Sequence, residues 1–133
     1  MKELKLIVKI NKPARQVFEF TVNPANTSYW IDSIVKEESN SDPIVVGTIL
    51  RNWDAAGKMN EYKVTRYEPY SLFQIEATHQ DYKIRYSCRP IFANETEFEY
   101  YEWSDSNQLH APNMQEILEK LKDVMEKHPL HSH

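Results

Sequence analysis

Glycine and cysteine are scarce, with only two glycines and one cysteine among the 133 residues. Gly47 and Gly57 are too few for a glycine-rich loop that cradles a phosphate. A single cysteine, Cys88, cannot form a disulfide within the chain. Because unpaired cysteines are typical of a reducing compartment, we expect a cytoplasmic protein.

Long apolar runs and an excess of one charge are also lacking. No stretch approaches the ~20 apolar residues that span a bilayer, and the polar start at residues 1–5 has no signal-peptide core. The net charge of −4 comes from interspersed acidic and basic residues, which argues against a nucleic-acid surface. No biased tract interrupts the chain. We therefore expect one domain over residues 1–133, without a membrane span or a nucleic-acid partner.

Local signals are clearest in residues 4–31. Residues 4–10 alternate between apolar and mostly polar side chains, which predicts a strand with one buried face. Pro13 is typical of a first helical turn, and Asn23-Pro24 ends the helix that it starts. A second short helix is predicted over 25–30, ending at Trp30.

The remainder of the chain favours strands followed by one helix. Turn residues separate five predicted strands, at 44–53, 59–67, 72–78, 82–89 and 96–103. Their spacing indicates an antiparallel meander. Apolar residues at helical spacing then predict an amphipathic helix over 112–128.

One register satisfies both faces of the last two strands. It places the basic residues Lys83, Arg85 and Arg89 opposite acidic and aromatic partners on an outer face, where Tyr101 and Trp103 also lie. The same register brings three inward residues beside three others, in the predicted pairs Ile84 with Glu102, Tyr86 with Tyr100, and Cys88 with Phe98.

This element order resembles the helix-grip fold of the START-like superfamily, also called SRPBCC. The residues that carry the resemblance are I-N-K-P-A-R-Q-V-F-E-F (10–20), Trp30, Val46-Gly47 opening a strand, V-T-R-Y-E-P (64–69) and L-E-K-L-K-D-V-M-E (118–126). The superfamily includes birch-pollen-type allergens, lipid-transfer domains and polyketide cyclase/dehydrase-like proteins. The resemblance implies an α+β fold in which a curved antiparallel sheet of about six or seven strands wraps around a long C-terminal helix. It also implies two short helices after the first strand and an elongated apolar cavity.

Inward-facing residues supply a predicted cavity lining. The thirteen candidates for ligand binding are Tyr62, Val64, Phe73, Ile75, Tyr82, Ile84, Tyr86, Phe98, Tyr100, Met114, Ile117, Leu118 and Leu121. The alternative is that these side chains fill the core completely. The number of inward tyrosines favours a cavity, because a buried hydroxyl without a partner costs about 1–3 kcal/mol.

Two acidic positions are candidates for proton transfer. Glu102 is predicted to face inward, where a carboxyl group could donate a proton to a carbonyl ligand or accept one. The favoured alternative for Glu102 is a position at the strand end, in solvent or paired with an arginine. His79 and Asp81 could form an acid–base pair at a cavity mouth, although a solvated turn is the favoured interpretation.

Cysteine, histidine and aspartate give weaker functional signals. Cys88 is interpreted as a small core residue and not as a nucleophile, because no base is indicated near it. A metal site at His128, His131 and His133 is the alternative to an exposed tail there. For Asp32 and Asp54 no partner is predicted. We expect no metal and no cofactor.

Three functions remain open at this point. The preferred hypothesis is a carrier that binds a hydrophobic or aromatic small molecule, as a monomer or weak homodimer. The alternatives are an enzyme of the polyketide cyclase/dehydrase type that uses the same cavity, and a protein-interaction module like the chaperone-activator branch of the superfamily. The residues leave open whether the chain is an enzyme.

Overall fold

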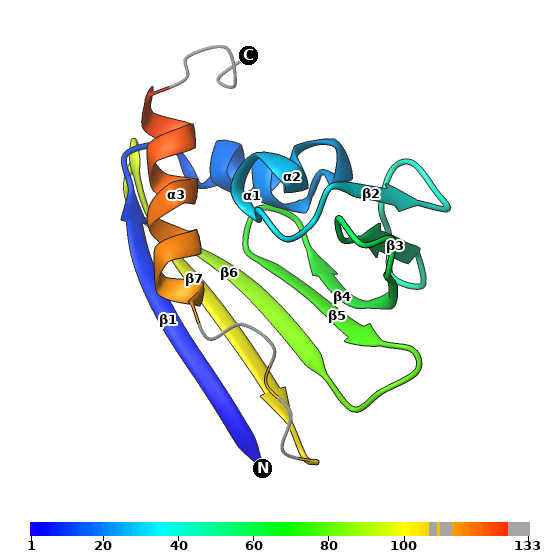
Figure 1. Cartoon of the computed structure of the whole chain (residues 1–133). Helices are drawn as coiled ribbons and strands as arrows, with labels where there is room; N and C mark the ends of the chain where they lie inside the picture. Colours follow the sequence, from blue (N-terminus) through cyan, green and yellow to red (C-terminus); the bar gives the residue numbers. More distant parts are fainter. Residues whose placement is uncertain (107–108, 110–112, 128–133) are drawn as a thin grey trace.

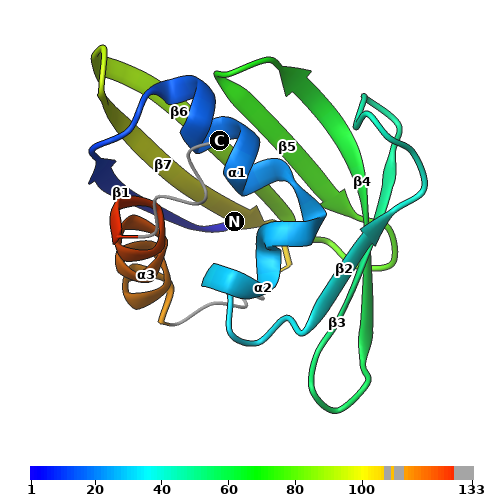
Figure 2. The same cartoon turned by 90° about the horizontal axis from the view of Figure 1, so that it is seen from above.

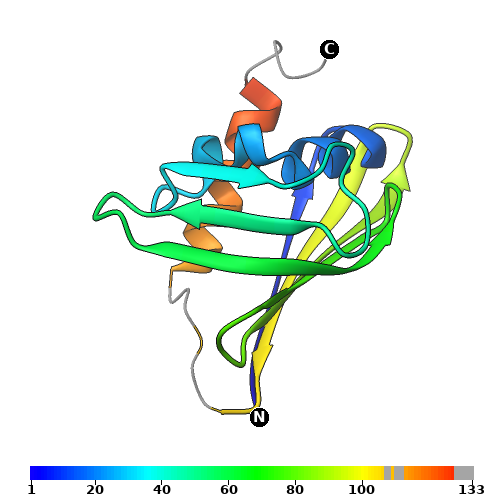
Figure 3. The ribbon, with the colours of Figure 1, turned by 90° about the vertical axis from the view of Figure 1, so that its right-hand side faces the viewer.

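Seven antiparallel strands form one open, curved sheet in a computed structural model that describes residues 1–106, 109 and 113–127. The strand order is β1-β7-β6-β5-β4-β3-β2. The strands are β1 (Lys2–Ile10), β2 (Lys36–Ser39), β3 (Ile49–Trp53), β4 (Met59–Glu68), β5 (Leu72–Ala77), β6 (Lys83–Phe92) and β7 (Glu95–Ser104). Figure 3 shows how strongly the sheet twists, since β3 and β4 run across the direction of β1 and β7.

Helices occupy the concave side of this sheet. They are α1 (Ala14–Val22), the 3₁₀ turn η1 (Pro24–Asn26), α2 (Thr27–Trp30) and α3 (Met114–Lys127). Seen from above, the sheet curves around all of them (Figure 2). The C-terminal helix α3 packs against β1 and α2 (Figure 1). No helix in the described part of the chain combines the length and apolar character that a membrane crossing requires.

These features confirm the predicted α+β helix-grip fold. Both short helices follow the first strand, and the last described element is an amphipathic helix with Leu118, Leu121 and Met125 buried. The register of the last two strands is also confirmed, because Tyr86 pairs with Tyr100 and Ile84 with Glu102.

The strand predicted over 44–53 is wrong in its first half. Only Ile49–Trp53 is extended, so Val46-Gly47 does not open a strand. Val45 and Val46 are more than half exposed, and the Thr48 N–H donates to the Val45 carbonyl oxygen across a turn. Gly47 has a φ of 98°, which valine would not adopt without strain. A short run of β-branched residues therefore led to a wrong strand prediction, because the run lies in a turn and not in a strand.

The sequence pattern also missed β2. This four-residue edge strand, K-E-E-S, pairs with β3 from Lys36 opposite Trp53 to Ser39 opposite Leu50. It has no apolar residue, so no alternation marks it. The strand is held instead by backbone hydrogen bonds to its neighbour β3.

Candidate ligand pocket

A pocket of about 300 Å³ lies between the concave face of the sheet, the α2 region and the start of α3. Its walls include residues from every strand but β1. Its lining residues are Thr27, Ile31, Ser33, Ile34, Glu37, Asn52, Asp54, Lys58, Asn60, Tyr62, Ile75, Tyr82, Ile84, Tyr86, Tyr100, Asn113, Met114 and Ile117.

Eight of the thirteen predicted positions line this pocket. They are Tyr62, Ile75, Tyr82, Ile84, Tyr86, Tyr100, Met114 and Ile117. The other five predicted positions, Val64, Phe73, Phe98, Leu118 and Leu121, are buried outside the lining. Phe98, for example, packs its ring 5.4 Å from that of Tyr86 and 6.3 Å from that of Trp30. The interior is therefore solid at one end and hollow at the other. Contact of these residues with a ligand stays a prediction.

Polar wall residues were missed by the sequence reasoning. Asn52 and Asn60 lie in phase with the inward residues Leu50 and Tyr62 along β3 and β4, so strict alternation could have found both. Glu37 gave no such signal, because its strand was not predicted at all.

The Glu37 carboxyl is held at the pocket wall by two donors. The Thr27 hydroxyl donates to its Oε1 at 2.6 Å, and the Asn52 amide donates to its Oε2 at 3.3 Å. The Asn60 amide in turn donates to Asn52 Oδ1 at 3.4 Å. Burial raises the pKa of Glu37 against the opposing effect of these hydrogen bonds. The pocket wall therefore holds a carboxyl group that keeps its proton to a higher pH than an exposed carboxyl group does.

The raised pKa of Glu37 predicts a specific dependence of stability on pH. As the pH rises, the unfolded chain releases this proton first, near the ordinary pKa of 4.5, and the folded chain releases it later. The free energy of unfolding should thus fall as the pH rises through the folded pKa, by about 1.4 kcal/mol per unit of pKa difference. Urea denaturation of the wild type and Glu37→Gln from pH 4 to pH 8 checks this, because the variant should lack that part of the slope.

The matched control for the pH experiment is Glu38→Gln. Glu38 is an exposed carboxylate on the same strand, 3.6 Å from the Lys36 ammonium. Its replacement removes one negative charge without touching the pocket. Identical slopes for the wild type and Glu37→Gln would contradict the prediction.

A second polar group joins two strands at the tyrosine-rich wall. The Tyr82 and Tyr100 hydroxyls lie 3.3 Å apart, and the Tyr100 hydroxyl donates to Glu102 Oε1 at 3.2 Å. Burial raises the pKa of both tyrosines well above its ordinary value, so both are neutral in the folded protein.

Glu102 faces inward as predicted, and the favoured alternative of a solvent-exposed strand end is wrong. Its side chain is fully buried and accepts a hydrogen bond from Tyr100. The cause is tertiary, because β1 flanks β7 on one side, with Leu4 opposite Glu102, and β6 flanks it on the other. Glu102 is not among the lining residues, and it reaches the pocket through lining tyrosines such as Tyr100.

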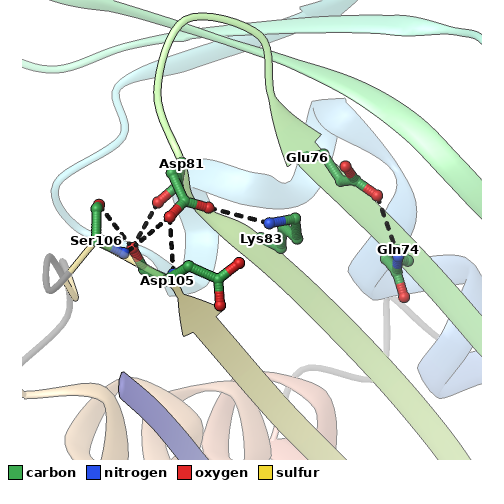
Figure 4. A network of polar contacts seen from close by, with 7 residues as sticks. Gln74, Glu76, Asp81, Lys83, Asp105 and Ser106 are labelled. Carbon is green, nitrogen blue, oxygen red and sulfur yellow. Dashed lines mark hydrogen bonds and ion pairs between the residues drawn. The ribbon is translucent and has the colours of Figure 1, made fainter. Parts of the chain in front are cut away.

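The proposed acid–base pair of His79 and Asp81 does not form. His79 is exposed and lies 3.5 Å from Glu61. Asp81 instead bonds the Lys83 ammonium at 3.0 Å and accepts from the Asp105 N–H at 2.7 Å (Figure 4). The Lys83 hydrogen bond lowers the pKa of Asp81. Asp81 thus fastens the turn before β6 to the end of β7.

The structure places Cys88 in the core and gives a partner to each of the two aspartates for which none was predicted. Cys88 is buried on the apolar face as expected, and burial raises the pKa of its thiol to about 12, which suppresses a nucleophilic thiolate. Asp32 pairs with Lys120 of α3. The Asp54 carboxylate accepts from the Ala56 and Lys58 N–H groups, both at 2.9 Å, and so closes the β3–β4 turn.

Metal binding finds no support in the described ranges. Within residues 1–106, 109 and 113–127, no three histidine, cysteine or acidic side chains lie together as a metal site would need. His128, His131 and His133 lie outside the described residues.

Comparison with known proteins identifies the fold. No family model matches the chain, and no curated protein matches it. Solved structures do match. The di-domain aromatase/cyclase BexL from the BE-7585A biosynthetic pathway has a TM-score of 0.76 at 16% identity, over 95% of this chain and 47% of that one. The chain therefore spans about half of that two-domain protein.

Two further matches cover nearly whole chains. The Aha1 dimer from Colwellia psychrerythraea gives a TM-score of 0.68 at 16% identity, over 95% of this chain and 97% of that one. Norcoclaurine synthase from Thalictrum flavum gives 0.69 at 12% identity, over 96% and 87%. These proteins share the helix-grip architecture of the SRPBCC group, so this chain has the helix-grip fold. At such low identity the likeness concerns the fold alone.

Proposed function

We propose that this chain binds a hydrophobic or aromatic small molecule in the pocket between the sheet and α3. The observation that carries the proposal is the pocket of about 300 Å³, in which apolar walls meet a few convergent polar groups. Isoleucines from β5, β6 and α3 supply apolar surface, and Glu37 and the tyrosines supply the polar groups. This combination is typical of small-molecule sites.

The structural neighbours support a ligand in this position without identifying it. The norcoclaurine synthase structure contains dopamine and hydroxybenzaldehyde, two small aromatic compounds. By analogy of fold, we expect an aromatic or similarly apolar ligand here. The single cysteine, Cys88, has no cysteine in the chain to pair with, which supports the proposal of a reducing cytoplasm. We further propose one domain over residues 1–133, acting as a monomer or weak homodimer.

Filling the pocket provides a direct test. Ile84 lines the pocket and is only partly buried, so tryptophan at this position should occupy ligand space while the strand still pairs. We expect Ile84→Trp to weaken binding of a naphthalene-based fluorescent probe by about tenfold or more, which is roughly 1.4 kcal/mol. Fluorescence titration measures this, and native mass spectrometry of the purified protein would reveal a ligand already bound.

The control for this test is Ile7→Trp. Ile7 lies on β1 with 45% of its surface exposed and does not line the pocket. The same bulk added there should leave the probe affinity unchanged. Ile117→Phe on α3 provides a second obstruction from the opposite wall. If neither pocket variant alters binding in a folded protein, the probe binds elsewhere and the proposal fails.

An enzyme of the polyketide cyclase/dehydrase type is the second candidate function. The observation that favours it is the Glu37 carboxyl, which lines the pocket and whose pKa is raised by burial. Such a group could donate a proton to a carbonyl ligand. Glu37 is therefore a better placed candidate than Glu102, because Glu37 lines the pocket directly. Turnover of a candidate ketone that Glu37→Gln abolishes while binding persists would establish catalysis.

The interaction module finds less support. Tyr101 and Trp103 stack on each other at 4.9 Å on the outer face of β7. The Arg85 guanidinium lies 5.2 Å from the Trp103 ring centre, and Lys5 lies 5.4 Å from that of Tyr101. These aromatic faces are already occupied by cations of the same chain, so the pocket carries the proposal instead.

A further inference from the structure

Two of the four pocket tyrosines have hydroxyls without a hydrogen-bond partner among the described residues. Tyr62 and Tyr86 are 8% and 7% exposed, and neither hydroxyl has a hydrogen bond to any residue that the structure describes. By contrast, Tyr82 and Tyr100 bond each other. A hydroxyl without a protein partner in a side chain buried to this degree must find its hydrogen-bond partner in the accessible space beside it, as water or as a ligand.

Both tyrosines line the pocket. Tyr62 and Tyr86 line it from β4 and β6, with β5 between these strands. Within the described residues, Trp30 Nε1 is the single fully enclosed side-chain nitrogen or oxygen without a partner. The Tyr62 and Tyr86 oxygens are therefore not sealed in the core, and the accessible space beside them is the pocket.

Glu37 lies close to the same two side chains. Burial raises the pKa of Tyr62 to about 12, with smaller contributions from Glu37 and Glu102. Burial followed by Glu37 and Tyr62 also raises the pKa of Tyr86. Both phenols therefore stay protonated and retain a hydrogen that each can donate. Two hydrogen-bond donors and one carboxyl group thus belong to the lining of the same pocket.

The charge of the lining limits which ligands fit. Among the described lining residues the carboxyl groups are Glu37 and Asp54, and the one basic side chain is the exposed Lys58 in the β3–β4 turn. An anionic ligand would lie near Glu37 without a buried cation to offset its charge. A cationic ligand is not required either, because both Glu37 oxygens already accept hydrogen bonds from Thr27 and Asn52. The Tyr62 and Tyr86 hydroxyls therefore need an uncharged hydrogen-bond acceptor.

We propose that the ligand is an uncharged aromatic molecule with a carbonyl oxygen that accepts hydrogen bonds from the Tyr62 and Tyr86 hydroxyls. This inference names the ligand class of the pocket and so rests on the proposed function. The apolar part of the ligand contacts Ile75, Ile84 and Ile117, and its oxygen points toward β4 and β6.

Four probes with one ring system test the ligand class. They are 2-acetylnaphthalene, 2-ethylnaphthalene, 2-naphthoate and 1-(2-naphthyl)ethylamine, which carry a ketone, a hydrocarbon, an anion and a cation of similar size. Isothermal titration at pH 7 should show the ketone binding about tenfold or more tightly than each of the other three. Two net hydrogen bonds account for that ratio.

Variants that remove one oxygen atom each test the residues. Tyr62→Phe and Tyr86→Phe should each reduce the affinity for the ketone by about threefold to tenfold while leaving the affinity for the hydrocarbon unchanged. The matched control is Tyr67→Phe. Tyr67 is also on β4, but it packs 5.5 Å from Phe18 outside the pocket lining, so this variant should bind both probes like the wild type.

The possible results separate this inference from the function on which it rests. Equal affinity for the ketone and the hydrocarbon, in the wild type and in both pocket variants, would overturn the carbonyl inference and leave the carrier intact. Tightest binding of the amine or the naphthoate would overturn it in favour of a charged ligand. Failure of all four probes to bind would overturn the proposed function and this inference together.

Discussion

Replacing Phe98 with alanine is expected to lower the free energy of unfolding by about 3–5 kcal/mol. The Phe98 side chain is fully buried on β7. Its ring lies 5.4 Å from the Tyr86 ring on β6 and 6.3 Å, edge to face, from the Trp30 ring on α2. The substitution leaves a cavity where the sheet meets the short helices, and the ring neighbours on β6 and α2 cannot fully close it. Urea denaturation followed by circular dichroism measures the loss.

Phe92→Ala is the matched control for Phe98→Ala. Phe92 ends β6 with 70% of its surface exposed, so the same chemical change there should alter stability by about 0.5 kcal/mol or less. If Phe98→Ala costs less than about 1 kcal/mol, the ring cluster is not the centre of the core. Such a result would also weaken the division of the interior into a solid and a hollow end.

Leu118→Ala should lower the free energy of unfolding by about 2–5 kcal/mol, because it removes the attachment of the C-terminal helix. Leu118 is fully buried on α3, one residue after the pocket-lining Ile117. It holds the helix against the body of the domain, where α3 packs on β1 and α2. Thermal and urea denaturation provide the measurement, and affinity for a naphthalene probe should fall as well, since α3 forms one wall of the pocket.

Ile117→Ala distinguishes the two roles of this helix. Its side chain is only partly buried and faces the pocket, so truncation should cost less stability, about 1 kcal/mol, and enlarge the pocket. A larger loss of stability for Ile117→Ala than for Leu118→Ala would show that α3 is held through the pocket wall and not through its buried stripe.

The best sequence prediction was the register of β6 and β7. Alternation placed Tyr86 beside Tyr100 and the basic residues of β6 opposite acidic and aromatic residues of β7, and the structure pairs Tyr86 with Tyr100 and Arg85 with Tyr101. The prediction was possible because a slip of one residue would turn every apolar side chain of the hairpin to the solvent. For the same reason, most of the strand residues that line the pocket could be selected in advance.

The part of the site that escaped prediction lies on β2. Glu37 reaches the pocket wall because K-E-E-S pairs with β3, and no apolar residue in that segment marks it as a strand. Its hydrogen-bond donors, Thr27 and Asn52, lie ten and fifteen residues away in the sequence. No local sequence pattern indicates that Thr27 and Asn52 form hydrogen bonds with Glu37.

Glu102 shows the opposite case, in which the direction of a side chain was predicted and its surroundings were not. Alternation along β7 pointed the carboxyl group inward. The expectation of solvent at the strand end failed because β1 pairs along the full length of β7, from Lys2 opposite Ser104 to Ile10 opposite Thr96. Burial at a strand end depends on neighbours from the other end of the chain.

The sequence alone determined the order of the elements, the positions of most strands and which side chains face inward, because hydrophobic periodicity is local and repeats along each element. The helix-grip fold followed from the resemblance that this order and its motifs carry. Only the tertiary structure decided which inward residues fill the core and which surround a pocket, because that depends on how closely α3, α2 and the twisted sheet approach one another. It also decided that the Tyr62 and Tyr86 hydroxyls have no hydrogen-bond partner among the described residues, while the Tyr82 and Tyr100 hydroxyls bond each other. That difference arises from contacts between strands and is the most specific information about the ligand.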